Sequence, residues 1–335
     1  MNSTLPIGKI HPEFLSELLD RYTARNGRVV VGSGIGEDAA VIDMGDRYLI
    51  AKTDPITCAT DQVGYYVVNI NANDIAAMGG MPRWFLATVL VPEGTDHGGL
   101  ELIFSQISNS CRELEIVYCG GHTEVTTGVK NPVVIGQMLG EAGRTELRPS
   151  SEARNGDDLV MTKSAAIEAT SLIAREREAE LAKHFSRDFL ARARQFLYDP
   201  GISVLKEARV LAGFRGIHAY HDPTEGGIST GIYEMAKASG LGCTVVYHAI
   251  PVREETAKLC EFYGIDPLGT FASGSMLMSV APHLTDAVIN KLAGAGIPAS
   301  KIGTLVSPDR GMILDTGDSL RPLPVYHQDE FSRIP

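Results

Sequence analysis

The chain has 335 residues, of which 44% are hydrophobic and 21% charged, and its formal net charge at pH 7 is −11. The length predicts two domains with ample material for a core, and the negative charge argues against nucleic acid as a partner. No apolar run approaches the roughly 20 residues that cross a bilayer, so no membrane partner is expected.

The expected location is cytoplasmic. The segment MNSTLPIGKIHPEF has neither the basic nor the apolar stretch of a secretory leader. The cysteines are odd in number and no CxxC pair occurs, so we interpret them as reduced, mostly buried thiols rather than as disulfide or zinc ligands. They are Cys58, Cys111, Cys119, Cys243 and Cys260.

The first half of the chain alternates between strand and helix patterns. In chain order these patterns predict a helix at residues 12–22, strands at 28–31, 39–43 and 48–52, a helix at 62–78, a strand at 84–91, a helix at 98–114, and strands at 115–119 and 131–139. Gly79 and Gly80 suit a left-handed cap for the 62–78 helix, and Pro82 prevents its continuation.

The stretch 143–158 is rich in Arg, Ser, Glu and Pro, so we expect an N-terminal domain at 1–148 and a C-terminal domain at 149–335. Beyond it the patterns predict a strand at 158–162, a helical, charged and solvated stretch at 167–196, a strand at 219–221, a helix at 228–239, a strand at 243–247, a helix at 254–263, a strand at 275–280, a helix at 284–295 and a final strand at 300–305. This alternation predicts an α/β or α+β fold class.

Five acidic residues lie at breaks between predicted elements. They are Asp38, Asp54, Asp74, Glu124 and Asp222. Asp74 also falls in the apolar row of the 62–78 helix. A lone ionised carboxylate is costly to bury, so Asp74 needs a partner, and a metal ion is a good candidate. Several carboxylates at strand ends and glycine-rich turns favour Mg²⁺ carrying a polyphosphate.

The turn HDPTEGG precedes the helix predicted at 228–239. Gly226 and Gly227 would let a phosphate approach N–H groups at the positive helix end, and Asp222 would hold the accompanying cation. The alternative is an ordinary turn in which Asp222 caps local backbone. The fragment GSGIG at 32–36 also has two interpretations, a phosphate-binding loop or a plain glycine turn. The motif GxxxxGK[ST] is missing, which excludes a classical P-loop.

Other polar residues have both a structural and a functional interpretation. Asn71 lies on nearly the same helix face as Asp74 and is either a ligand or the hydrogen-bond partner of that carboxylate. His122 and His221 are interpreted as structural, because Mg²⁺ prefers oxygen ligands. Two lysines at strand ends, at positions 52 and 163, either reach a phosphate or, by default, are solvated.

Three segments together resemble the superfamily that contains aminoimidazole ribonucleotide (AIR) synthetase, thiamine-monophosphate kinase, selenophosphate synthetase and the hydrogenase maturation factor HypE. GIGEDAAVI resembles its N-terminal motif, and NINANDIAAMGGMPRWFL resembles its most characteristic helix. HDPTEGGISTGIYEMAKASG resembles the HDPTRGG motif of HypE and the helix after it. The segments cover about residues 30–310 in the family's order.

The resemblance implies a two-domain PurM-like fold. The N-terminal domain would pair with a second copy to form a β-barrel in a homodimer, and the C-terminal domain would be an α/β layer. ATP and Mg²⁺ would bind between domains, and the γ-phosphoryl would pass to an oxygen. The implied metal ligands are Asp38, Asp54, Asp74 and Asp222, of which Asp74 and Asp222 are the implied catalytic residues. The implied nucleotide-binding residues are Gly34, Gly36, Asp38, Asn71, Gly121, Gly226 and Gly227.

Two features depart from the family pattern. The family commonly has GDT after its central strand, where this chain has Gly121-His122-Thr123. Either Glu124 substitutes, or the site binds one metal fewer, or phosphoryl transfer is weakened. HypE ends in Pro-Arg-Ile-Cys, whose thiol carries a carbamoyl group, whereas this chain ends in SRIP, with Pro335 in place of the Cys.

Three functions follow as hypotheses. The leading one is an ATP- and Mg²⁺-dependent enzyme related to HypE that phosphorylates or activates an oxygen of an unidentified acceptor. The second is a small-molecule kinase of the thiamine-monophosphate type, which NDIAAMGG favours. The third is a nucleotide-binding maturation partner or regulator with little turnover, which His122 suggests.

Overall fold

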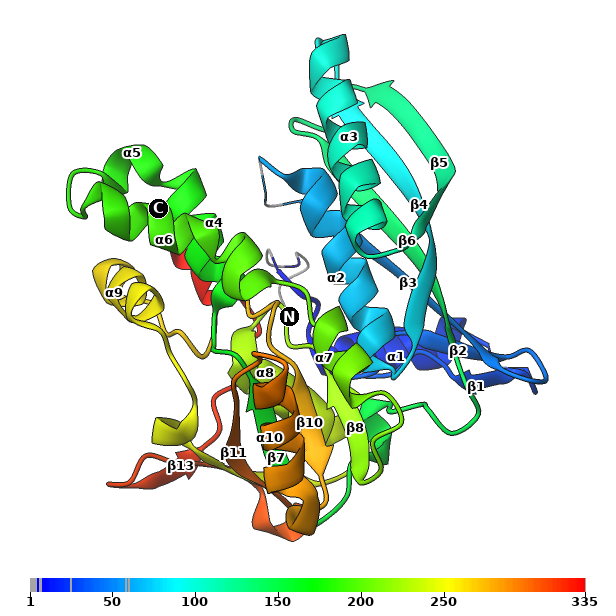
Figure 1. Ribbon diagram of the computed structural model, residues 1–335, viewed down its shortest axis with the longest axis vertical. Helices are drawn as coiled ribbons and strands as arrows, with labels where there is room; N and C mark the ends of the chain where they lie inside the picture. The colour runs from blue at the N-terminus through cyan, green and yellow to red at the C-terminus, as the bar shows by residue number, and fades with distance from the viewer. Residues whose placement is uncertain (1–4, 6–7, 25, 58, 60, 335) are drawn as a thin grey trace.

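Two β-sheets, each covered by helices, make up the fold of the protein (Figure 1). The computed structural model describes residues 5, 8–24, 26–57, 59 and 61–334. The first sheet is built from residues before position 143 and the second from residues after position 157.

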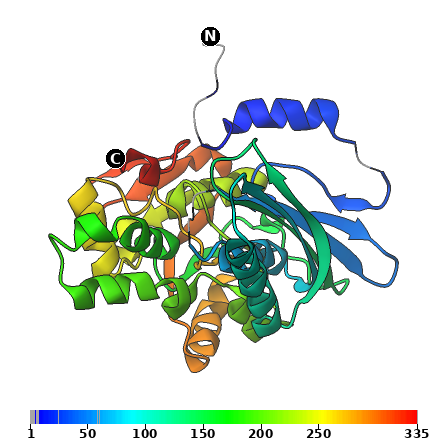
Figure 2. The same cartoon turned by 90° about the horizontal axis from the view of Figure 1, so that it is seen from above.

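The first sheet has six strands in the order β1-β2-β3-β6-β4-β5, and its neighbours are antiparallel except for the parallel pair β4 and β5. The strands are β1 (Val29–Val31), β2 (Ala40–Asp43), β3 (Tyr48–Ile56), β4 (Met81–Pro92), β5 (Val117–Thr126) and β6 (Val133–Ala142). Helices α2 (Val63–Ala77) and α3 (His97–Glu113) lie side by side against it (Figure 1). Helix α1 (Pro12–Tyr22) lies at the periphery and buries no residue (Figure 2).

The second sheet has seven strands in the order β13-β12-β9-β11-β7-β10-β8, with a parallel pair at β9 and β12. Its strands are β7 (Asp158–Thr162), β8 (Ile217–His221), β9 (Gly242–Val246), β10 (Leu277–Val280), β11 (Ala299–Val306), β12 (Met312–Asp315) and β13 (Leu320–Pro322). The helices of this half are α4 (Ile167–Glu176), α5 (Glu178–Leu181), α6 (Arg187–Gln195), α7 (Leu205–Leu211), α8 (Gly227–Ala238), α9 (Glu254–Tyr263) and α10 (Thr285–Gly294).

Strand alternation places two cores on opposite faces of the second sheet. On β7, Leu159 and Met161 join the core that contains residues of α8, whereas Val160 joins the core that contains residues of α7 and α10. Every residue of β7 is therefore buried, as expected of a central strand covered on both faces.

Helix α2 connects the two halves. Its Val67 and Ile70 belong to the core under the first sheet, while Ala76 and Ala77 belong to the core that also contains β8 and β10 residues. Because apolar neighbours surround it, almost every α2 residue is buried. The helix therefore carries Asp74 to the place where the two halves meet.

The mixed α/β class and most expected elements are confirmed. Gly79 is left-handed, with φ of 79°, as its cap position predicts. The strand expected at 300–305 is confirmed as β11, but it is not the final strand, because the short strands β12 and β13 follow it. Helix α7 was not predicted. The stretch 167–196 is three helices, and α4 is buried from Ile167 to Ala174 rather than solvated.

The first sheet is open. Across the residues that the structure describes, no closed barrel forms, so the dimeric barrel stays a prediction. The cysteines at 111, 119, 243 and 260 are free thiols, and all but Cys119 are buried. Cys58 and Pro335 lie outside the described residues. Within the described part of the chain, no helix has both the length and the apolar character to cross a membrane.

Candidate functional site

Three aspartates from distant parts of the sequence converge between the two sheets. Asp38, Asp74 and Asp222 each offer a carboxylate oxygen, and these oxygens lie within 4.8 Å of one another. All three residues are buried, at 8%, 4% and 3% exposure. Three carboxylates this close need positive charge to remain ionised together.

Each aspartate is held by a different element. Asp38 lies in the loop between β1 and β2, Asp74 on the last turns of α2, and Asp222 directly after β8. Gly36 sets the path of the Asp38 loop: its φ is 76°, and a Cβ there would lie 2.4 Å from the Glu234 carbonyl oxygen of α8. A glycine is thus required both by conformation and by close approach.

Asp74 has a cationic partner within the chain. Lys52 Nζ lies 2.7 Å from Asp74 Oδ1 and 3.7 Å from Asp54 Oδ2. The default expectation that Lys52 is solvated is therefore wrong. Asp74 has a partner within the chain, and a metal ion as a further partner stays a prediction. Lys52 and Asp54 are two residues apart on β3, so their side chains share one face of the strand. This spacing was the signal in the sequence that could have found Lys52.

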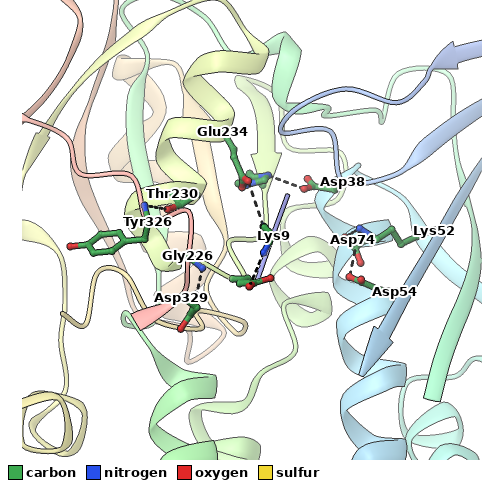
Figure 3. Close-up of polar contacts among 12 residues, drawn as sticks. Lys9, Asp38, Lys52, Asp54, Asp74, Gly226, Thr230, Glu234, Tyr326 and Asp329 are labelled. Atoms are coloured by element: carbon green, nitrogen blue, oxygen red, sulfur yellow. Dashed lines mark hydrogen bonds and ion pairs between the residues drawn. The ribbon is translucent and has the colours of Figure 1, made fainter. Parts of the chain in front are cut away.

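A second cationic group lies against Asp38. His221 Nδ1 is 2.8 Å from Asp38 Oδ1, and His221 Nε2 is 3.3 Å from Glu234 Oε2 (Figure 3). Glu234 in turn lies 3.5 Å from Lys9 Nζ. These contacts agree with the structural interpretation of His221, because its imidazole ring orients the Asp38 carboxylate.

Burial dominates the electrostatics of the three aspartates. Burial raises the pKa of Asp74 to about 7, against the lowering effect of Lys52. The pKa of Asp222 is also raised, first by burial and then by Asp74 and Asp38. For His221, burial opposes the charged form, but Asp38 and Glu234 outweigh it and raise the pKa. Lys52 and His221 therefore offset only part of the negative charge.

The aspartates fit a hard divalent cation. Asp38 Oδ2, Asp74 Oδ2 and both Oδ atoms of Asp222 are buried and have no hydrogen-bond partner among the described residues. Unpartnered buried oxygens are costly, and Mg²⁺ takes carboxylate oxygens as ligands. The donor set thus matches Mg²⁺, and Asp38, Asp74 and Asp222 are the residues that would hold it.

Asp54 and Asn71 lie beside this cluster. Asp54 is paired with Lys52, its side chain is 35% exposed, and it is not one of the three converging aspartates. The Asn71 amide nitrogen donates to the carbonyl oxygens of Val67 and Asp54, at 2.8 and 3.2 Å. Its Oδ1 has no hydrogen-bond partner within the part of the chain that the structure describes. Asn71 therefore fastens α2 to the end of β3.

The glycines before α8 are used in packing. The Gly226 N–H donates to Asp329 Oδ2 at 2.8 Å, so a phosphate would have to displace that carboxylate (Figure 3). A Cβ at Gly227 would lie 2.3 Å from the Leu268 carbonyl oxygen. Both residues also have positive φ. Close approach of neighbouring loops accounts for the glycine pair.

The remaining predicted positions are not members of the three-aspartate cluster. Gly34 lies in the Asp38 loop, and a Cβ at this position would lie 3.5 Å from the Glu37 side chain. Gly121, His122 and Glu124 belong to β5, not to a turn. A Cβ at Gly121 would meet the Ala87 carbonyl oxygen of β4, which explains that glycine by packing. The His122 and Glu124 side chains are 68% and 52% exposed and contact each other at 3.4 Å.

Lys163 is also not solvated. It is buried, its Nζ lies 2.9 Å from Glu207 Oε1, and it donates to the Ser203 carbonyl oxygen at 2.6 Å. Burial lowers the pKa of Lys163, against the opposing effect of Glu207. Lys163 therefore holds the 201–203 segment and is not one of the residues around the aspartates.

Two similar proteins align with most of the chain. A putative hydrogenase expression/formation protein of Methanocaldococcus jannaschii is 26% identical over 314 residues, covering 90% of this chain and 90% of that protein. Carbamoyl dehydratase HypE of Bradyrhizobium diazoefficiens is 27% identical over 290 residues, covering 83% of this chain and 80% of HypE.

Solved structures share the fold. HypE in complex with ATP has a TM-score of 0.73 at 22% identity, covering 96% of both chains. The HypE–HypF complex has a TM-score of 0.76 at 18% identity, covering 93% of this chain and 99% of that chain. AaThiL complexed with AMPPCP and TMP has a TM-score of 0.73 at 18% identity, covering 94% and 96%.

Family models match both halves of the chain. The model of the AIR synthase related protein N-terminal domain matches residues 36–142, and the model of the C-terminal domain matches residues 154–315. Asp38 and Asp74 fall within the first match and Asp222 within the second. The chain therefore belongs to the AIR synthase related protein family.

Proposed function

We propose that this protein is an ATP- and Mg²⁺-dependent enzyme that phosphorylates or activates an oxygen of its acceptor. One observation carries the proposal: Asp38, Asp74 and Asp222 converge within 4.8 Å and keep buried oxygens without partners. Such a set suits a cation that accompanies a polyphosphate. The relatives named as carbamoyl dehydratase, and the HypE structure in complex with ATP, support it.

The surrounding residues keep these carboxylates in place. Lys52 holds one oxygen of Asp74, and His221, itself held by Glu234, holds one oxygen of Asp38. The other oxygens stay free for a cation. When bound, Mg²⁺ supplies charge neutralisation to the polyphosphate. Because α2 and the β8 turn come from different halves, the site is preorganised by their packing.

Calorimetric binding of ATP with and without Mg²⁺ tests this proposal. Wild-type protein is expected to bind ATP more tightly with Mg²⁺, and Asp74→Asn is expected to abolish the difference. Asp318→Asn, which changes an exposed aspartate, is the matched control and is expected to keep it. Unchanged Mg²⁺ dependence in Asp74→Asn would refute the site.

The second candidate is a kinase of the thiamine-monophosphate type. It is favoured by the likeness to AaThiL complexed with AMPPCP and TMP. Incubation with thiamine monophosphate and Mg-ATP decides it, because a kinase of this type makes the diphosphate. If no diphosphate forms while ATP binds, this candidate is removed and the broader proposal stands.

A maturation role and a homodimer complete the proposal. The HypE relatives and the HypE–HypF complex support a maturation-protein partner. Under this proposal the chain divides into domains 1–148 and 149–335, and two first sheets form the dimeric barrel. Little turnover with tight ATP binding would favour a regulator over an enzyme.

A further inference from the structure

A cavity of about 370 Å³ is lined by residues of both halves of the molecule, and two parts of its wall lead to the three aspartates. Asp54, at the end of β3, contributes to its wall and also contacts Lys52, the partner of Asp74. Thr224 and Glu225, from the turn that begins with Asp222, form another part of the wall. Each half of the molecule therefore contributes a wall residue that is linked to the cluster, Asp54 through Lys52 and Thr224 through the turn after Asp222.

The interior of the cavity combines apolar and unsatisfied polar groups. Ile56, Ile70 and Leu172 supply apolar walls. Tyr66 and Ser273 are each 1% exposed, and their hydroxyl oxygens have no hydrogen-bond partner of good geometry among the described residues. Ser273 also lies against Glu168, and Tyr66 against Ser171. Buried hydroxyls that lack a well-formed hydrogen bond are uncommon, and here they line a space large enough for a ligand.

Glu168 is the most buried of the acids in this wall. It is the second residue of α4 and is 8% exposed. Burial raises the pKa of Glu168 to about 7, against the lowering effect of the adjacent Ser273. A cation placed beside it would favour the ionised carboxylate and remove the cost of its burial.

The described residues that line the cavity carry a net negative charge. Its acidic members are Asp54, Glu168 and Glu225, and among the described lining residues only Lys9 is basic. The Lys9 side chain is already directed to Glu234, at 3.5 Å, and its backbone N–H donates to Glu225 at 3.2 Å. An anionic ligand would meet repulsion in this cavity, whereas a cationic one would find carboxylates.

We propose that this cavity is the acceptor subsite and that Glu168 selects an acceptor with a cationic nitrogen group on an apolar body, such as an amidinium or ammonium. Naming the ligand the acceptor rests on the proposed function; the charge preference rests on the cavity alone. Tyr66 and Ser273 would add hydrogen bonds to the same group.

Three probes of nearly the same shape test the inference: benzamidine, benzamide and benzoate, whose head groups are positive, neutral and negative. Binding is measured by calorimetry or ligand-observed NMR without nucleotide or Mg²⁺. The expected order of affinity is benzamidine, then benzamide, then benzoate. Glu168→Gln is expected to weaken the binding of benzamidine about tenfold and to leave the binding of benzamide nearly unchanged. The differences in affinity among the three probes therefore become smaller.

Matched variants separate charge from folding. Glu168→Asp keeps the charge and is expected to keep the order, and Glu101→Gln, on the exposed face of α3, is the surface control. Equal affinity for all three probes in the wild type, or an unchanged order in Glu168→Gln, would overturn the inference. If Glu168→Gln does not fold, the wild-type order decides. Mg-ATP binding is measured separately, so the two proposals fail independently.

Discussion

The ion pair between Lys52 and Asp74 neutralises part of the negative charge of the site. Both side chains are largely buried, at 23% and 6% exposure. Removing the lysine leaves a buried carboxylate that either stays unpaired or takes up a proton. We expect Lys52→Met to lower the free energy of unfolding by about 2 kcal/mol in denaturant titrations.

A double variant shows whether this cost comes from the pair. Lys52→Met combined with Asp74→Asn is expected to be more stable than Lys52→Met alone, because the double variant no longer has the buried Asp74 carboxylate that loses its partner. Lys291→Met, at an exposed position of α10, is the control for losing a surface lysine. Additive effects of the two substitutions would contradict the pairing.

Glu168 predicts a pH dependence of stability. Its folded pKa of about 7 lies above the ordinary value of 4.5, so protonation favours the folded state. Its stabilising contribution is complete below pH 4.5 and is lost as the pH rises through 7. As the pH rises between these limits, the free energy of unfolding should fall by up to about 3 kcal/mol more in the wild type than in Glu168→Gln. Parallel pH profiles for the two proteins would contradict this.

At the scale of elements, the contact between the Asp38 loop and α8 sets the site. Gly36→Ala is strained by its positive φ and also places a Cβ 2.4 Å from the Glu234 carbonyl oxygen. Gly264→Ala is the matched control, because Gly264 has φ of 63° with no atom within 4 Å of the added Cβ. We expect Gly264→Ala to cost about 1 kcal/mol and Gly36→Ala clearly more.

The same pair of variants has a functional readout. Displacing the Asp38 loop should weaken Mg²⁺-dependent ATP binding in Gly36→Ala and leave it intact in Gly264→Ala, since Gly264 ends the remote helix α9. Equal stability and equal binding in the two variants would show that the loop does not need its close approach to α8.

Sequence patterns predicted regular elements well and failed where pairing is non-local. The helix expected at 62–78 is observed as α2 (Val63–Ala77), because both its apolar residues and its glycine cap are local signals. The strand predicted at 115–119 is observed as β5 (Val117–Thr126) and does not stop at 119. The strand continues through a bulge beside Leu86 of β4, which only the partner strand specifies.

The whole molecule builds the site from both halves. The Asn73 side chain donates to the Ile202 carbonyl oxygen at 2.7 Å and accepts from the Val204 N–H at 2.9 Å, which ties α2 to the second half. Asp38 and Asp74 therefore meet Asp222 only after the halves pack. The residue pattern alone favoured a Mg²⁺ and polyphosphate site, but it did not say which acids share one ion. The family resemblance supplied that grouping, together with Asp54, which is not one of the three converging aspartates.

The exposed edge of the first sheet predicts how two copies associate. Val117 and Val125 of β5 are 58% and 60% exposed. Exposed apolar side chains on an edge strand favour pairing with another chain. By light scattering we expect a homodimer of twice 36.0 kDa, and Val125→Lys should yield the monomer. Leu320→Lys, at a 71% exposed position of β13, should remain dimeric. A monomeric wild type would exclude the dimeric barrel.

The central claim is that Asp38, Asp74 and Asp222 bind one divalent cation together with a nucleotide. A crystal structure grown with Mn²⁺ and AMPPCP tests it most directly, because the anomalous signal of manganese locates the ion. The account predicts an anomalous peak about 2.1 Å from carboxylate oxygens of these aspartates, with the nucleotide phosphates on its open side. A nucleotide-bound structure with no peak between the three aspartates, or with the ion held elsewhere, would contradict it.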